Sequence, residues 1–168
     1  MIAEMLLLVA VPALLALAAG WDVASFTIPN AIPLALLAAF AMFVFAVPLA
    51  PATAGLHLGA GAVGLAAGFA LFAAGLIGGG DAKLFAAAAL WLGFRDLVDF
   101  ALWSSLFGGA LALAVLGLRT LVLPATLATQ GWLVRLHDAK SGIPYGVALA
   151  GGALMTLPNA DVYRFLGA

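Results

Sequence analysis

Long apolar runs alternate with short stretches of Gly, Pro and charged residues along the whole chain. Apolar runs of about 20 residues are the pattern of helices that cross a bilayer, and Gly and Pro mark the turns between them. The pattern predicts helices over residues 5–20, 31–47, 56–77, 84–94, 100–118 and 143–157. We therefore expect an all-α, polytopic membrane helix bundle with about six transmembrane helices, formed by a single domain over residues 1–168.

The composition supports a membrane protein and excludes several other classes. Hydrophobic residues make up 67% of the chain and charged residues 8%, against about 45–50% and about 25% in soluble proteins. The net charge of −1 argues against nucleic acid as a partner, because phosphate binding needs clustered Lys and Arg. The chain has no cysteine, and its histidines form no cluster with zinc spacing, so we expect no metal site and no cofactor.

Two segments add detail to this pattern. The stretch from Arg119 to Ser141 is the longest polar region, and we expect its middle, residues 121–136, to lie on the membrane surface. In the helix expected over residues 56–77, Gly61, Gly64 and Gly68 fall on one face. These glycines either permit close contact with another helix or reflect the general frequency of Gly in membrane helices.

The Lys and Arg residues predict how the chain is oriented. Cytoplasmic loops carry an excess of these residues. The connections after the first, third and fifth helices hold Lys83, Arg119, Arg135 and Lys140, whereas the remaining ends hold Arg95 and Arg164. This bias places the odd-numbered connections in the cytoplasm and both termini outside.

Three polar motifs fall on one side of the membrane when the crossings are counted. Asp22 follows the first helix, Asp81 follows the third, and residues 141–146 lead into the last, with two crossings between successive motifs. The count requires residues 84–118 to make two short or tilted crossings, although residues 84–94 would span only about 16 Å. A single long crossing would place charged residues in mid-bilayer at a cost of about 2.5–3.5 kcal/mol each. Those residues are Arg95, Asp96 and Asp99.

The two aspartates beside helix ends are candidates for chemistry. Two carboxylates in a partly dehydrated place cannot both ionise cheaply, so the pair shares a proton. Such a pair supplies a base that activates water and an acid that protonates the reacting carbonyl or the leaving amine. Peptide hydrolysis without a metal or a covalent nucleophile suits Asp22 and Asp81, and the glycines before Asp81 would let an extended peptide approach.

Plainer interpretations of the same residues remain open. Gly78–Gly80 could merely end a helix while Asp81 serves as the N-cap of the next one, and Asp22 could be an ordinary loop residue. Lys83 could anchor a helix end at the membrane surface, which we favour, or stabilise the charge of a neighbouring aspartate. Asp138 lies on the same side as the pair but within the longer polar stretch. His57 and His137 are expected on opposite sides of the membrane.

The motifs resemble those of a known family. Gly78-Gly79-Gly80-Asp81-Ala82-Lys83 resembles the G-x-G-D-x-K motif of the GxGD membrane aspartyl peptidases. Asp22, followed by Ile28-Pro29-Asn30, resembles the first catalytic aspartate and the I-P-N stretch of bacterial type IV prepilin peptidases. Ile143-Pro144-Tyr145-Gly146 resembles the segment that opens the last helix in that family. The three motifs occur in the family's order and span most of the chain.

The resemblance implies a hydrolase that removes the leader peptide from prepilin or pseudopilin precursors at the cytoplasmic face of the bacterial inner membrane. It implies that Asp22 and Asp81 are the catalytic pair. It also implies residues that bind substrate or shape the site, namely Gly78, Gly80, Lys83, Pro29, Asn30, Pro144, Tyr145 and Gly146. Larger members carry paired cysteines that accompany N-methylation. Because this chain has no cysteine, we expect no methylation, and the chain is most similar to the short peptidases of tight-adherence (Flp) pilus systems.

Two other classes of function fit an apolar chain with few charges. A non-catalytic assembly subunit would use the glycine-rich helices to pack against partners. A small proton or cation transporter would place Asp22 and Asp81 along an ion path, but such proteins often contain inverted repeats with broken helices, and the sequence shows no convincing repeat.

Overall fold

The computed structural model describes residues 1–124 and 126–166, so that Ala125, Gly167 and Ala168 lie outside the described residues. All regular elements in the described part are helices, which confirms the all-α expectation. In chain order they are α1 (Ile2–Met5), the π-helical turn η1 (Leu6–Ala10), α2 (Val11–Ser25), α3 (Ala31–Ala46), α4 (Pro51–Ala73), α5 (Gly79–Arg119), α6 (Gly131–His137), α7 (Tyr145–Thr156), and the 3₁₀ turns η2 (Leu157–Asn159) and η3 (Asp161–Phe165).

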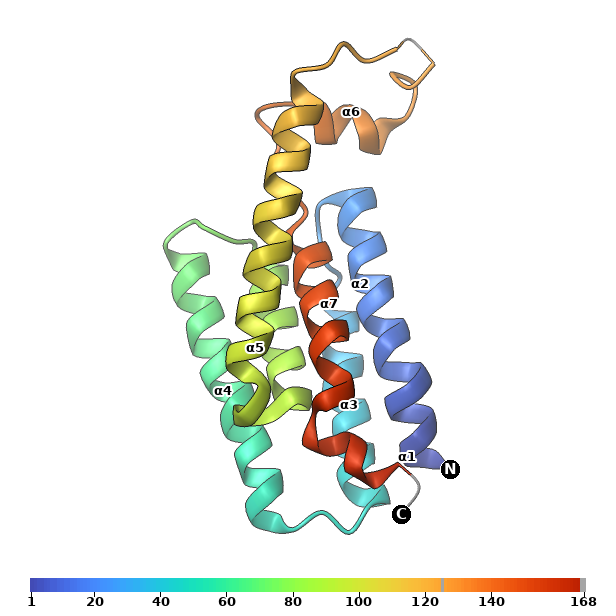
Figure 1. Ribbon diagram of the computed structural model, residues 1–168, viewed down its shortest axis with the longest axis vertical. Helices are drawn as coiled ribbons and strands as arrows, with labels where there is room; N and C mark the ends of the chain where they lie inside the picture. Colours follow the sequence, from blue (N-terminus) through green and yellow to red (C-terminus); the bar gives the residue numbers. More distant parts are fainter. Residues whose placement is uncertain (125, 167–168) are drawn as a thin grey trace.

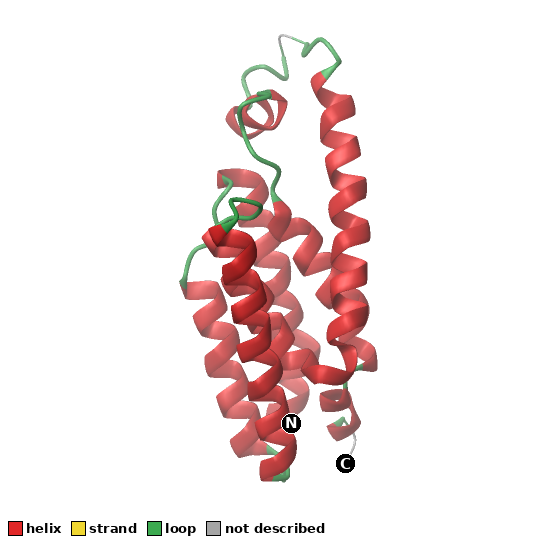
Figure 2. Cartoon of the chain, turned by 90° about the vertical axis from the view of Figure 1, so that its left-hand side faces the viewer, coloured by secondary structure: helices red, strands yellow, loops and turns green. Residues whose placement is uncertain are grey.

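The long helices run side by side along one axis, as expected for a bundle that crosses a bilayer (Figures 1 and 2). Within the residues that the structure describes, three helical stretches are long and apolar enough to span a membrane: Ile2–Ser25, Pro51–Ala73 and Gly79–Arg119. The first of them joins α1, η1 and α2 into one continuous helix. Both termini lie at one end of the bundle, and α6 lies at the other end (Figure 1).

Helix α5 is two antiparallel helical segments joined by a reversal at Gly93. The backbone of Gly93 has φ 74° and ψ −179°, whereas its neighbours remain helical. The rings of Phe85 and Phe100 stack with their centroids 4.9 Å apart, although residues so spaced would lie about 22 Å apart along a straight helix. Figure 1 shows the chain descending to this point and rising again. Residues 79–119 therefore form two antiparallel segments, as the count of crossings requires.

The position of this reversal corrects the sequence prediction. The turn was expected around Arg95, Asp96 and Asp99, but these residues lie in the first turns of the rising segment. The combination of φ and ψ at Gly93 is essentially restricted to glycine, and the charged residues near it mark the end of the bundle without making the turn. The descending segment also starts at Gly79, before the expected Leu84.

The first helix is longer than predicted, and this moves a candidate residue. The helix was expected to end at Gly20, but α2 continues to Ser25 and is closed by Phe26 in a left-handed conformation with φ 57°. The hydroxyl of Ser25 bonds back to the carbonyl oxygen of Trp21 at 2.8 Å, which satisfies the polar side chain within the helix. Asp22 therefore lies in the last turn of α2 and not in the following loop.

Other helix bounds are shifted by local signals. The helix predicted over residues 56–77 is α4, which begins earlier because Pro51 is favourable in the first turn. It ends at Ala73, just before Gly75 adopts φ 72°. Within the surface segment expected over residues 121–136, the described helix is only α6, from Gly131.

Three glycines bring α4 close to the descending segment of α5. A Cβ atom on Gly64 would lie 2.8 Å from the Cβ of Ala89, and one on Gly68 would lie 2.9 Å from the Cα of Ala82. A Cβ on Gly61 would lie 3.1 Å from the Cβ of Leu90. The close-contact interpretation of these glycines is thus confirmed.

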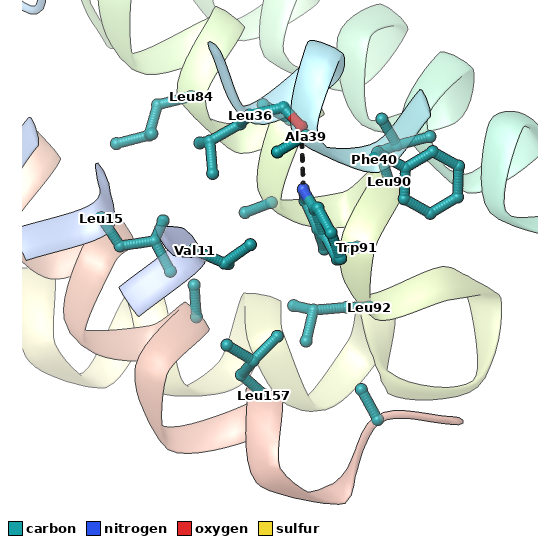
Figure 3. Packing of buried hydrophobic residues seen from close by; sticks show 14 of the residues in the cluster. Val11, Leu15, Leu36, Ala39, Phe40, Leu84, Leu90, Trp91, Leu92 and Leu157 are labelled. Atoms are coloured by element: carbon teal, nitrogen blue, oxygen red, sulfur yellow. Dashed lines mark hydrogen bonds between the residues drawn. The ribbon is translucent and has the colours of Figure 1, made fainter. Parts of the chain in front are cut away.

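The centre of the bundle is held by an aromatic cluster that joins α3 to α5. Trp91 is 1% exposed and packs against Phe40 and Phe43, with ring centroids 5.3 and 5.6 Å from its own. Its indole N–H donates to the carbonyl oxygen of Leu36 at 3.0 Å (Figure 3). The indole therefore fills the core without leaving a buried donor unsatisfied.

We predict that Gly93→Ala destabilises the protein by about 1–3 kcal/mol, because an alanine cannot easily adopt this backbone conformation. Its Cβ would also lie 3.1 Å from the ring of His57. The matched control is Gly109→Ala in the same helix, where a Cβ meets nothing within 4 Å. Thermal unfolding in detergent should show a lower Tm for Gly93→Ala only. Equal Tm values for the two variants would contradict the account of the reversal.

Candidate active site

The three sequence motifs meet at the end of the bundle that lies away from both termini. They are placed there by the last turn of α2, the first turn of α5 and the first turn of α7 (Figure 1). Asp22 and Gly146 are joined by a hydrogen bond across 124 positions of sequence. Asp81 and Tyr145 line one cleft. The expectation that the three motifs share one side is confirmed.

Asp22 is buried against the start of α7. Its side chain is 4% exposed, and its Oδ2 accepts a hydrogen bond from the backbone N–H of Gly146 at 2.7 Å. This N–H lies in the first turn of α7, where backbone donors have no partner inside the helix and where a negative charge is stabilised. The carboxylate of Asp22, which belongs to α2, therefore caps the N-terminus of α7.

Asp81 is held at the beginning of its own helix. It is 9% exposed, and its Oδ2 accepts a hydrogen bond from the backbone N–H of Gly78 at 2.9 Å. Gly78 is the N-cap of α5, and Asp81 is the third residue of the helix. Asp81 does therefore cap α5, but it reaches back from the third helical position and is not the N-cap itself.

The two carboxylates form a buried electrostatic pair. The charge of Asp81 acts directly on Asp22, with both side chains shielded from solvent. Like charges in such surroundings are costly to hold together. Two carboxyl groups placed in this way are candidates for general acid–base chemistry.

Ile28 positions the three motifs relative to one another. Its side chain is 6% exposed and lies between two glycines. A Cβ on Gly80 would be 3.0 Å from the Cβ of Ile28, and one on Gly146 would be 2.7 Å from its Cδ1. The residue was not among the predicted site residues, although it opens the I-P-N stretch. The signal available in the sequence was its apolar side chain, together with the glycines of the other two motifs, which leave room for such a side chain.

Lys83 and Asn30 connect the first turn of α5 to the start of α3. The ammonium group of Lys83 donates to the amide oxygen of Asn30 at 2.7 Å. Both residues stand at one end of an otherwise apolar groove of about 520 Å³ between α3, α4 and α5. Pro29 precedes them, and its carbonyl oxygen accepts the N–H of Ile32 at 3.0 Å. Lys83 is thus bound to the I-P-N stretch in this structure.

A second, more polar cleft of about 410 Å³ opens beside Asp81. Tyr145 contributes to its wall and is kept in place by Gly108, where a Cβ would lie 2.9 Å from the tyrosine ring. Pro144 is buried at the N-cap of α7. The cleft is lined by Gly75, Leu76, Ile77, Gly78, Asp81, Arg119, Ser141, Gly142, Ile143 and Tyr145.

Three other titratable residues lie away from the aspartate pair. His57 is buried beside Gly93, and its Nδ1 lies 2.9 Å from the carbonyl oxygen of Leu90. His137 lies at the opposite end, with its Nε2 2.8 Å from the carbonyl oxygen of Leu121. Asp138 is exposed and accepts the N–H of Lys140 at 2.9 Å. The two histidines are therefore on opposite sides, as the count of crossings predicted.

A comparison with protein families adds an independent observation to this geometry. A family model described as the type IV leader peptidase family matches residues 9–113, which is more than half of the chain and includes both Asp22 and Asp81. The chain belongs to the type IV leader peptidase family. It is therefore a peptidase, and its apolar helices make it a membrane protein. Neither the comparison with curated proteins nor that with solved structures returned a match.

The match to the leader peptidase family ends before the third motif. Residues 143–146 lie beyond the matched range, so their place in the site rests on the contacts of Gly146 with Asp22 and Ile28. The structure thus adds to the matched range a motif at the start of α7 that the match does not cover.

We predict that Gly146→Ala lowers peptidase activity about tenfold or more, because small displacements of reacting groups are costly. The added Cβ would lie 2.7 Å from the Cδ1 of Ile28 and 2.8 Å from the Oδ2 of Asp22, so one of them must move. The control is Gly20→Ala, in the same helix as Asp22, where a Cβ meets nothing within 4 Å. Leader cleavage at saturating substrate measures the effect, and full activity of Gly146→Ala would refute the predicted packing.

Proposed function

We propose that this leader peptidase is an aspartyl endopeptidase in which Asp22 and Asp81 together activate water. Its substrates are prepilin-like precursors of the Flp type. The observation that carries the proposal is the meeting of two buried carboxylates, from motifs far apart in sequence, beside a cleft. A buried pair of this kind is costly for a membrane protein to maintain and tends to mark function.

In the proposed reaction the ionised aspartate removes a proton from water, and the resulting hydroxide attacks the scissile carbonyl carbon. The protonated aspartate donates its proton to the carbonyl oxygen. The tetrahedral intermediate then collapses: one of its hydroxyl groups returns a proton to the ionised aspartate, the C–N bond breaks, and the departing amine takes up the proton held by the other aspartate. Either aspartate can serve as the first base, because two coupled carboxyl groups titrate as a pair and not as separate groups.

The cleft beside Asp81 suits an extended peptide. One wall consists of residues 75–78 and the other of residues 141–143. Gly75 and Gly78 on the first wall, and Gly142 on the second, carry no side chain, which allows a peptide backbone to come close. The site also lies at an end of the bundle, where a bond between a polar leader and an apolar helix would be found. The structure therefore supports cleavage at the membrane surface.

The distribution of basic residues supports a cytoplasmic site in the bacterial inner membrane. Lys83 and Arg119 lie at the end of the bundle that holds the aspartates, and Arg135 and Lys140 belong to the surface segment there. At the other end Arg95 and Arg164 both bind Asp161, at 2.9 and 3.1 Å. The excess of basic residues at the site end favours the cytoplasm.

The absence of cysteine supports a short, Flp-type peptidase without methyltransferase activity. The cysteine pairs that accompany N-methylation in larger prepilin peptidases have no counterpart in this chain. An Flp-type prepilin is therefore the first substrate to test.

The test is leader removal in membranes that contain the protein and an Flp-type prepilin. We predict that Asp22→Asn and Asp81→Asn each reduce the cleavage rate by about 100-fold or more, because each removes a proton-transferring group. Asp138→Asn is the matched control and should retain the wild-type rate, because Asp138 is exposed and bonds only locally. Wild-type processing by both Asp22→Asn and Asp81→Asn would overturn the mechanism and favour a non-catalytic role.

A shared proton also predicts the form of the pH dependence. The rate should rise and then fall as the pH increases, because the reaction needs one carboxyl group protonated and the other ionised. At low pH the base is lost, and at high pH the acid is lost. Single-turnover cleavage in detergent over a range of pH measures this profile. A rate that falls only at low pH, or only at high pH, would indicate a single catalytic group.

A further inference from the structure

An arginine at the end of α5 forms hydrogen bonds to the segment that leads into α7. Because α5 reverses at Gly93, Arg119 returns to the end of the bundle at which the helix began with Asp81. Figure 1 shows this end of α5 rising beside α6. The guanidinium group binds the polypeptide that connects α6 to α7, and Arg119 lines the same cleft as Asp81.

Arg119 donates three hydrogen bonds to backbone carbonyl oxygens of this connection. Its Nε bonds to the oxygen of Leu136 at 3.0 Å. Its Nη2 bonds to the oxygens of Ser141 and Gly142 at 2.9 and 3.1 Å. Hydrogen bonds from an ionised group are roughly twice as strong as neutral ones. A planar guanidinium can also hold several acceptors in one fixed arrangement. One side chain thus holds both ends of the turn that follows α6.

This turn reaches the aspartates over a very short distance in sequence. Gly142 is followed by Ile143, Pro144 and Tyr145, and then by Gly146, whose N–H is bonded to Asp22. Pro144 has a restricted backbone, so displacement of Gly142 is transmitted to the start of α7. Ser141, Gly142 and Arg119 also line the cleft beside Asp81. The turn therefore lines the cleft beside Asp81 and lies four residues before the N–H that binds Asp22.

We propose that Arg119 is a positioning residue for peptide cleavage. It fixes the turn at residues 141–142 and thereby sets the Gly146–Asp22 hydrogen bond and the wall of the cleft. This proposal rests on the peptidase mechanism given above. Arg119 belongs to none of the three motifs, G-x-G-D, I-P-N and I-P-Y-G. It also lies beyond the range matched by the family model.

The kinetic test compares Arg119→Ala, Arg119→Lys and the control Arg135→Ala, with wild type, on an Flp-type prepilin. Arg135 is an exposed arginine on the same surface segment. We expect kcat to fall by about 10- to 100-fold in both Arg119 variants, because misplacement by about 1 Å has effects of that size. KM should change much less. Lysine should not restore the rate, since an ammonium group cannot form the same fork. Arg135→Ala should retain the wild-type kcat.

A second measurement separates positioning from simple loss of fold. Hydrogen exchange of the peptides covering residues 141–150 should be faster in both Arg119 variants than in wild type or Arg135→Ala, while peptides from α4 should remain unchanged. The Tm in detergent is recorded for each variant, and kcat is expressed per folded molecule. Arg119→Lys keeps a positive charge and a long stem, so it remains testable if Arg119→Ala fails to fold.

The outcomes distinguish this proposal from the mechanism on which it rests. If wild type cleaves the precursor but both folded Arg119 variants keep kcat within about twofold of wild type, Arg119 is only a structural residue and the proposal is overturned. Rescue by lysine would also overturn it. If the Asp22→Asn and Asp81→Asn variants cleave normally, the two-aspartate mechanism fails first, and the positioning role fails with it.

Discussion

The reversal of α5 at Gly93 determines which end of the bundle the last third of the chain reaches. Without it, a continuous α5 would carry Arg119, and with it α6 and the start of α7, to the end of the bundle where the N-terminus lies. With it, Asp81 and Arg119, the two ends of one helix, line the same cleft, and α7 starts beside Asp22. The reversal needs a backbone conformation that is essentially restricted to glycine, so one residue without a side chain controls the assembly of the site.

Small residues then allow polar groups to be buried where apolar packing would otherwise exclude them. Gly80 and Gly146 both contact Ile28 at distances that leave no room for a Cβ atom. The backbone N–H groups of Gly78 and Gly146 each bond to one aspartate, which compensates part of the cost of burying a carboxylate. The same packing that fixes the helices therefore holds the two carboxyl groups at the site where we propose that they act as acid and base.

Much of this arrangement could be predicted from the sequence, because crossings can be counted from apolar runs. The count placed Asp22, Asp81 and residues 143–146 on one side, and the structure confirms it. Local details were less accessible. The turn was expected at Arg95, Asp96 and Asp99 because charge is a stronger signal than a single glycine, and Asp22 was assigned to a loop because its helix ends in polar residues. Arg119 was missed because its role rests on tertiary contacts, which no local pattern reveals.

The proposed site requires the three motifs to share one side of the membrane. Cysteine accessibility tests this directly, because the chain has no cysteine of its own. Single substitutions Thr27→Cys, Leu76→Cys and Lys140→Cys probe the site end, and Ala50→Cys and Asn159→Cys probe the other end, all at exposed positions. A membrane-impermeant maleimide applied to oriented vesicles should label the first three from one side and the last two from the other. Labelling of Lys140→Cys from the side opposite to Leu76→Cys would contradict the reversal of α5 and, with it, the proposed site.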